Sequence, residues 1–94
     1  MDEKIVEAVI LRLVDARLKK GISQNRLAEL AGLSRSGLRH LEDGETNPTL
    51  YSLLKIAGAL NVKIGRLIGV VMREEIRAMP VVKKRAEKTR RASR

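Results

Sequence analysis

The stretch SQNRLAELAGLSRSGLRHLE, residues 23–42, decides the fold, because it reads as two short helices joined by a tight turn. Its apolar residues recur at the three- and four-residue spacing that gives each half one buried helical stripe. They are Leu27, Ala28, Leu30 and Ala31 in the first half, and Leu33, Leu38 and Leu41 in the second. Two helices that share a core in this way can present the second helix to a DNA groove, so we predict a helix-turn-helix unit.

Four small residues explain how the turn is made. Gly32 is expected to end the first helix with a positive φ, a conformation that costs a residue with a Cβ about 1 kcal/mol or more. Ala28 lies where the two helices cross, and a larger side chain would push them apart. Ser23 and Ser34 each offer a hydroxyl to the free N–H groups at the start of a helix. The joint spacing of these signals supports the unit more strongly than any one of them.

Beyond this unit, residues 11–68 resemble the helix-turn-helix domain of the phage repressor and Cro family, also called the Xre family. The matching pieces are RLKKGISQNRLAELAGLS, HLEDGETNP and TLYSLLKIAGALNVKIGRLI. The resemblance implies an all-α, five-helix, lambda-repressor-like domain. It also implies a transcriptional regulator that binds double-stranded DNA, usually as a dimer.

The second helix of the unit carries the polar face expected to read bases. Leu38 and Leu41 point inward, so the polar residues between and before them lie on the opposite side. The candidate base readers are Arg35, Ser36, Arg39 and His40. Arginine can donate bidentately to guanine O6 and N7, which discriminates by roughly 1 to 3 kcal/mol, and Arg35 at the helix start is best placed. Ser36 and His40 match family positions that touch bases, and the alternative for the whole set is a solvated polar face.

His40 is the only histidine and the chain has no cysteine, so we expect neither a metal site nor a cofactor. Base or phosphate contact is the preferred role for His40, and a solvated histidine without a special function is the alternative.

A second group of residues is expected to touch the DNA backbone. Gln24 matches the family glutamine that contacts a phosphate, and its neighbours are close enough to help. The loop after the reading helix is acidic at Asp43 and Glu45, which leaves its neutral residues as donors. The expected backbone contacts are Gln24, Asn25, Arg26, Ser34, Thr46 and Asn47. Phosphate contacts position a protein without reading sequence.

Arg17 and Glu42 are interpreted as structural. The resemblance implies that they form a largely buried salt bridge between the first helix and the end of the third. Removing one partner of such a pair should cost several kcal/mol, and an exposed pair under about 1 kcal/mol.

The remaining helices follow from the apolar pattern. A first helix is expected over about residues 3–20, and a fourth is expected to begin after a Thr49 cap. The fourth is expected to face the core through Leu50, Leu53, Leu54, Ala57 and Leu60. A fifth begins near Lys63 and continues to Pro80, so the helix-turn-helix domain is placed at residues 1–80.

The apolar stripe of this fifth helix continues beyond the point where the five-helix core of the family is complete. The surplus residues are Val71, Met72, Ile76 and Met79. We predict that they form a homodimer interface, and the alternative is that they fold back on the first helix.

Charge is concentrated at the C-terminal end. The 94-residue chain carries a net charge of +9, of which residues 81–94 supply +6 and the other eighty residues +3. This basic tail is predicted to be flexible, either as an arm on DNA phosphates or as a solvated extension. Tyr51 is the only aromatic residue, which disfavours the stacking of single-stranded nucleic acid.

The sequence therefore predicts a cytoplasmic, nucleoid-associated homodimer that represses transcription from a palindromic operator. The alternative is an antitoxin-type protein that mainly binds a partner toxin and uses DNA for autoregulation. A membrane-surface role is remote, and we expect neither a signal peptide nor a bilayer-spanning segment. An enzyme is the least favoured class, because no nucleophile–base pair is evident.

Overall fold

The computed structural model of the chain describes residues 2–77, which form five helices. They are α1 (Asp2–Lys19), α2 (Gln24–Ala31), α3 (Arg35–Glu42), α4 (Leu50–Leu60) and α5 (Ile64–Arg77). The expected all-α architecture is confirmed, and the predicted start and end of α1 are each within one residue. The predictions made for Met79, Pro80 and the basic tail at residues 81–94 lie outside the described residues, as does the side chain of Ile76.

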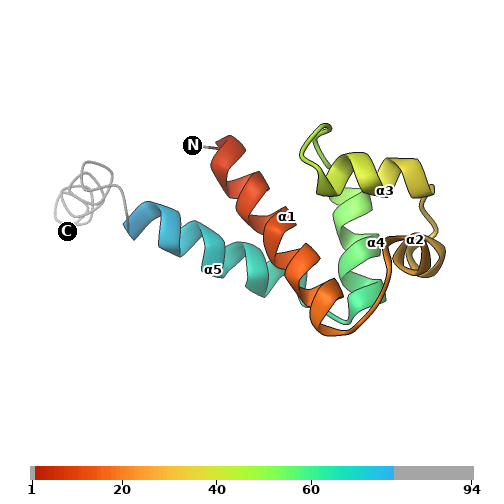
Figure 1. Cartoon of the computed structure of the whole chain (residues 1–94). Helices are drawn as coiled ribbons and strands as arrows, with labels where there is room; N and C mark the ends of the chain where they lie inside the picture. The colour runs from red at the N-terminus through yellow and green to blue at the C-terminus, as the bar shows by residue number, and fades with distance from the viewer. Residues whose placement is uncertain (1, 78–94) are drawn as a thin grey trace, which may run out of the picture.

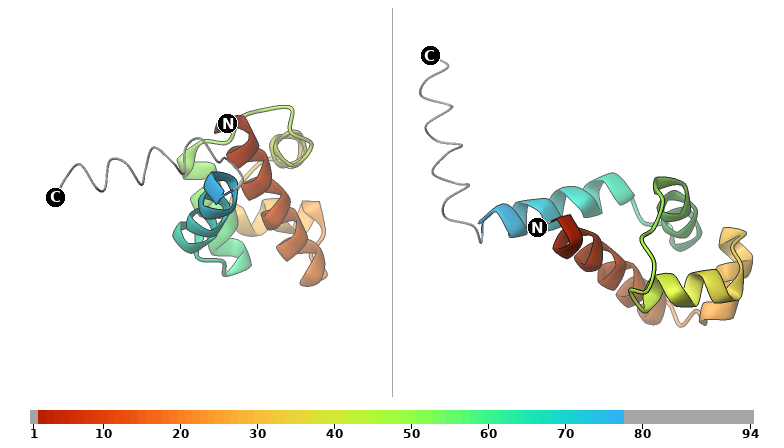
Figure 2. Two further views of the ribbon diagram at one scale, coloured as in Figure 1. Left: turned by 90° about the vertical axis from the view of Figure 1, so that its left-hand side faces the viewer. Right: turned by 90° about the horizontal axis from the view of Figure 1, so that it is seen from above.

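The helices are arranged with α1 and α4 in the middle of the domain (Figure 1). The α2–α3 unit packs on one side, where α2 contacts α4 and α3 contacts α1, and α5 runs against α1 on the other side. The right-hand view of Figure 2 shows the same separation between α5 and the α2–α3 unit. Among residues 2–77, no helix is both long enough and apolar enough to cross a bilayer.

The predicted turn between α2 and α3 is confirmed. Gly32 has a φ of 67°, and the Leu33 N–H donates to the Ala28 carbonyl at 2.9 Å, so α2 ends in a Schellman motif. The Ser23 hydroxyl accepts from the Arg26 N–H at 3.1 Å, and the Ser34 hydroxyl accepts from the Gly37 N–H at 3.0 Å. Both helices of the unit therefore begin at the residues that the sequence marks, and α2 also ends at the marked glycine.

One core joins all five helices. The side chain of Ala28 in α2 is buried in this core. The other buried apolar residues are Val9, Ile10, Leu13, Leu27, Ala31, Leu38, Leu41, Ile56, Ala57, Leu60 and Val71. This core is aliphatic, and it orients the outer face of α3 away from the rest of the domain.

Three leucines that the pattern assigned to buried stripes are exposed instead: Leu30, Leu50 and Leu54. In α4 the buried stripe runs through Ile56, which the prediction omitted, together with Ala57 and Leu60. Leu54 lies beside that stripe and is 50% exposed, and Leu50 stands at the first, solvent-facing turn. Apolar character alone was therefore a poor guide to the face that α4 buries.

Val71 corrects one part of the interface prediction. Its side chain is fully buried among the core residues, so it stabilises the single domain and offers no surface to a second copy. For this residue the fold-back alternative is right, because α5 packs along α1. Its neighbour Met72 is 41% exposed and remains accessible.

A pair of charged side chains also fastens α5 to α1. The Nη2 atom of Arg12 donates to both carboxylate oxygens of Glu74, at 2.9 and 2.7 Å. Both side chains are exposed, and nothing in the sequence pattern had linked these residues, which lie 62 positions apart.

Candidate nucleic-acid interface

The outer face of α3 is set by the way this short helix is anchored. Leu38 and Leu41 are buried beneath it, and the Ser34 cap fixes its first turn. The predicted readers Arg35, Ser36 and Arg39 are exposed as a result, whereas His40 is partly buried. The hydroxyl of Ser34 accepts a bond in the cap, and its own O–H remains able to donate to a phosphate.

Five of the predicted DNA contacts surround one hollow. It has a volume of about 310 Å³ and lies where the start of α2 meets the outer face of α3. Its lining residues are Gln24, Asn25, Arg35, Ser36 and Arg39. Between residues 2 and 77, neither arginine of this group forms an ion pair. Two cations and three neutral polar side chains are thus available together at one surface.

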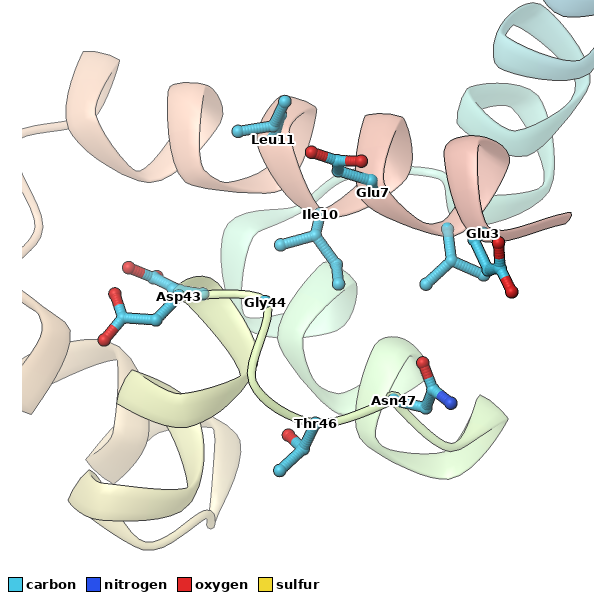
Figure 3. Close-up of a pocket in the computed structure, with 10 residues that line it drawn as sticks. Glu3, Glu7, Ile10, Leu11, Asp43, Gly44, Thr46 and Asn47 are labelled. Atoms are coloured by element: carbon cyan, nitrogen blue, oxygen red, sulfur yellow. The ribbon is translucent and has the colours of Figure 1, made fainter. Parts of the chain in front are cut away.

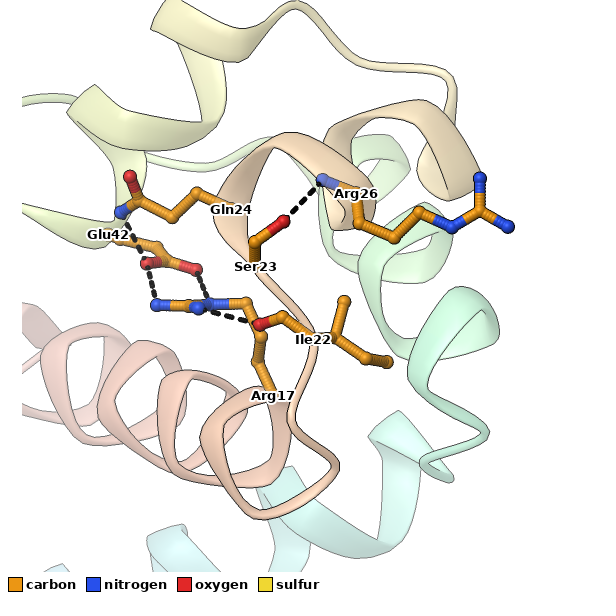
Figure 4. Close-up of polar contacts among 6 residues, drawn as sticks. All are labelled: Arg17, Ile22, Ser23, Gln24, Arg26 and Glu42. Atoms are coloured by element: carbon orange, nitrogen blue, oxygen red, sulfur yellow. Dashed lines mark hydrogen bonds and ion pairs between the residues drawn. The ribbon is translucent and has the colours of Figure 1, made fainter.

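A buried network holds one edge of this hollow (Figure 4). The ion pair expected between Arg17 and Glu42 is present: the Nε and Nη2 atoms of Arg17 donate to the two carboxylate oxygens at 2.9 and 3.0 Å. Arg17 Nη1 also donates to the Ile22 carbonyl at 2.8 Å. The carboxylate has a third donor that the sequence did not reveal, since Gln24 Nε2 lies 2.8 Å from Glu42 Oε1.

The third bond fixes the orientation of the Gln24 amide. An ionised carboxylate only accepts hydrogen bonds, so the nitrogen of the amide must face Glu42. One N–H of that nitrogen remains free to donate, and the amide is held at the edge of the hollow. The residue expected to touch a phosphate is therefore positioned by the same carboxylate that closes the salt bridge with Arg17.

The other predicted contacts are placed elsewhere. Arg26 pairs with Glu29 on the exposed surface of α2, at 3.0 Å. His40 contacts the loop residue Glu45 through its Nδ1 atom, a pairing that the residue pattern did not predict. Gly44 was the available signal, because a glycine just after a helix commonly turns the chain back on the last turn.

Thr46 and Asn47 line a separate groove of about 420 Å³ between the N-terminal half of α1 and the loop after α3 (Figure 3). Its other polar lining is largely acidic, with Glu3, Glu7, Glu42 and Asp43. Because phosphates are repelled by carboxylates, this groove is electrostatically less suited to nucleic acid than the hollow at α2 and α3. We still expect Thr46 and Asn47 to contact DNA, but from the outer surface of the loop and not from inside this groove.

A short helix fixed by a glycine turn, with arginines on its outer face that pair with no acidic side chain of residues 2–77, defines a helix-turn-helix domain of the kind that docks on DNA. The comparison with known families agrees, since a helix-turn-helix family model matches residues 13–67. The chain belongs to this family, and its relatives place it in the Xre, or Cro/C1-type, branch.

Several relatives support this assignment. The chain is 36% identical over 64 residues to an uncharacterised helix-turn-helix transcriptional regulator of Haemophilus influenzae, covering 68% of this chain and 61% of that protein. It is 38% identical over 58 residues to the immunity repressor protein of Bacillus phage phi105, covering 62% of this chain and 40% of that protein. The matched regions are thus less than two thirds of the length of either relative.

A solved structure is also similar. The crystal structure of the restriction-modification controller protein C.AhdI from Aeromonas hydrophila superposes with a TM-score of 0.60 at 40% sequence identity. The match covers 67% of this chain and 94% of the controller protein. The arrangement of helices is therefore shared with a protein of known structure at substantial sequence identity.

Proposed function

We propose that the chain regulates transcription by binding double-stranded DNA in a sequence-specific manner, with α3 in the major groove. The observation that carries this proposal is the hollow where Arg35, Ser36 and Arg39 of α3 meet Gln24 and Asn25 of α2. No competing ion pair within residues 2–77 engages the two arginines. Base-reading and phosphate-binding groups are thus presented side by side.

The roles of these residues follow from their positions. The N-terminal residues of a recognition helix contact base edges, so Arg35 and Ser36 are the principal readers. Arg39, one turn further along, reaches either a base or a phosphate. Gln24, Asn25 and the hydroxyl of Ser34 bind the backbone and set the register of α3 in the groove.

We further propose that the protein is a homodimeric repressor of a palindromic operator. Two copies of α3 about 34 Å apart would meet successive major grooves on one face of the duplex. The exposed side chain of Met72 supports an interface on α5, together with the predicted residues Ile76 and Met79. Repression is supported by the name of the phage relative, an immunity repressor.

Selection of bound duplexes from a random pool tests the proposal. The expected product is a palindrome whose half-sites lie about one helical turn apart. A single half-site without symmetry would reject the homodimer but would still support base reading by α3. Recovery of no preferred sequence would reject specific regulation altogether.

The interface has its own test in sedimentation velocity. Met72→Glu should dissociate the dimer, whereas Leu54→Glu, an equal change on an exposed position of α4, should leave it intact. If only Leu54→Glu dissociates the protein, the interface lies on α4.

A second candidate function, the antitoxin-type role, is favoured by one observation on α4. Leu50, Tyr51 and Leu54 are 65%, 68% and 50% exposed on this helix, and neighbouring exposed apolar side chains often mark a protein contact. This role predicts that a toxin encoded beside the gene binds the purified protein and that Leu54→Glu releases it. DNA binding by the same variant should be unchanged.

A further inference from the structure

His40 and Glu45, at the end of α3, are joined by both their backbones and their side chains. The Glu45 N–H donates to the His40 carbonyl at 2.9 Å, and the Gly44 N–H donates to the Leu41 carbonyl at 3.2 Å. With Gly44 at a φ of 76°, these bonds form a Schellman motif. The turn brings the Glu45 carboxylate onto the Nδ1 atom of His40.

This contact determines what the imidazole ring can offer to DNA. An ionised carboxylate only accepts, so Nδ1 must carry the proton in the contact, and Nε2 is the nitrogen left for another partner. In a neutral ring Nε2 is then an acceptor, which cannot bind a phosphate oxygen. In a protonated ring Nε2 becomes a donor, which can.

We propose that Glu45 is a positioning residue that makes DNA binding draw a proton onto His40. This inference rests on the proposed function. When the first residues of α3 read bases, its last turn and the loop that follows lie nearer the phosphates. A phosphate at Nε2 and the Glu45 carboxylate at Nδ1 then hold a proton on the imidazole from both sides. The proton comes from solvent, and the imidazolium bonds both anions.

The same arrangement explains how an acidic loop can lie beside DNA. Glu45 by itself would repel a phosphate, and the imidazolium between the two anions replaces this repulsion with two charge-assisted hydrogen bonds. Deprotonation of His40 removes both the donor and the compensating charge. His40 and Glu45 therefore act as a unit.

Within residues 2–77, the other charged groups near α3 do not pair with His40. From α1, Arg17 reaches α3 and is bound to Glu42, which also accepts from the neutral Gln24 of α2. The remaining charged groups on α3, on its loop and across the acidic groove are Arg35, Arg39, Asp43, Glu3 and Glu7. Of the described residues, only Glu45 forms an ion pair with His40.

The sign of the pH effect follows from proton linkage. Because the proposed bound state holds the proton more firmly than the free state, affinity rises as the pH falls. Uptake of one proton changes Kd by at most about tenfold per pH unit.

The first experiment measures Kd for the selected duplex at constant salt between pH 5.5 and 8.5. The wild type should bind more tightly as the pH falls, and His40→Gln should show no such slope. Glu45→Gln should lose the slope between pH 6.5 and 8. Asp43→Asn is the matched control, because it removes one carboxylate from the same loop and should keep the slope.

The second experiment reads the ring directly. Since His40 is the only histidine, its imidazole ¹⁵N signals need no assignment. In the free protein at pH 7.5 we expect Nδ1 to carry the proton, and in the complex with the selected duplex we expect both nitrogens to carry one. In the Glu45→Gln complex only one nitrogen, Nε2, should carry a proton at that pH, because the neutral ring is then free to donate to the phosphate through Nε2.

The possible outcomes distinguish proton uptake at His40 from the proposed DNA-binding function. A wild type that selects a duplex but has a flat pH profile, or a neutral ring in the complex, overturns the inference and leaves the proposed function standing. A Glu45→Gln variant with the wild-type slope overturns it as well. A wild type that prefers no duplex at any pH contradicts the proposed function itself.

Discussion

Helix α1 makes two arginine–glutamate pairs of the same chemistry in different surroundings. Arg17 and Glu42 join α1 to α3 with side chains only 10% and 7% exposed, whereas Arg12 and Glu74 join α1 to α5 at 44% and 54% exposure. In both pairs the guanidinium bonds both carboxylate oxygens. What distinguishes the Arg17–Glu42 pair is its burial, together with the further bonds of Arg17 to the Ile22 carbonyl and of Gln24 to Glu42.

Breaking the buried pair should cost more stability than breaking the exposed pair, because water cannot replace either buried partner. Removing one charge leaves the other buried and uncompensated, while solvent and salt screen the exposed pair. The Glu42 carboxylate also orients Gln24 at the edge of the candidate DNA surface. The α1–α3 joint therefore links the stability of the domain to the geometry of the α2–α3 hollow, whereas neither residue of the α1–α5 joint lines that hollow.

The largest expected effect is that of Arg17→Ala. Stranding the Glu42 carboxylate should lower the free energy of unfolding by about 3 to 5 kcal/mol. Urea denaturation followed by circular dichroism measures it. A variant that unfolds at the urea concentration of the wild type would show that the pair is not a structural element.

A double variant, Arg17→Met with Glu42→Leu, sharpens the comparison. Replacing a buried ion pair by apolar residues of similar size is often neutral or stabilising, so most of the lost stability should return. The amide of Gln24 nevertheless loses its partner, and Kd should rise by about fivefold to tenfold for all duplexes, which corresponds to about 1 to 1.4 kcal/mol. Restored stability with unchanged Kd would mean that Glu42 does not position Gln24.

Gly44→Ala tests the end of α3 that carries Glu42. A Cβ at Gly44 meets no atom within 4 Å, so its effect comes from the positive φ and should be about 1 kcal/mol of lost stability. Gly58→Ala is the matched control inside α4, where the Cβ also meets nothing and φ is helical. That change should stabilise the protein by about 0.4 to 1 kcal/mol. Equal effects of both substitutions would reject the backbone explanation.

The smallest effect is expected for Arg12→Ala. The exposed pair with Glu74 should contribute under about 1 kcal/mol at low salt. In 1 M salt the wild type and the variant should become nearly indistinguishable, because the Debye length is then about 3 Å. A loss comparable to that of Arg17→Ala would contradict the comparison.

The sequence was a good guide wherever structure depends on local chemistry. Gly32, Ser23 and Ser34 each act on their own helix end, so the turn and its caps could be predicted. The outward direction of Arg35 and Ser36 likewise follows from the period of one short helix.

Contacts between distant residues had no such signal. The period of α4 allowed more than one apolar face, and only packing against α2 and α1 selected Ile56 over Leu54. Val71 was misassigned because the pattern could not show how α5 lies along α1. The bond between Gln24 and Glu42 depends on how α2 and α3 are placed, a geometry that residue spacing does not contain.

The most direct test of the account measures binding to the selected duplex and to each of its single base-pair variants. We predict that Arg35→Ala loses preference at one base pair per half-site, by about 1 to 3 kcal/mol, and keeps the others. Gln24→Ala should weaken binding to all these duplexes by a similar factor. If Arg35→Ala instead weakens every duplex equally and keeps the full pattern of preference, α3 does not read bases in the way proposed.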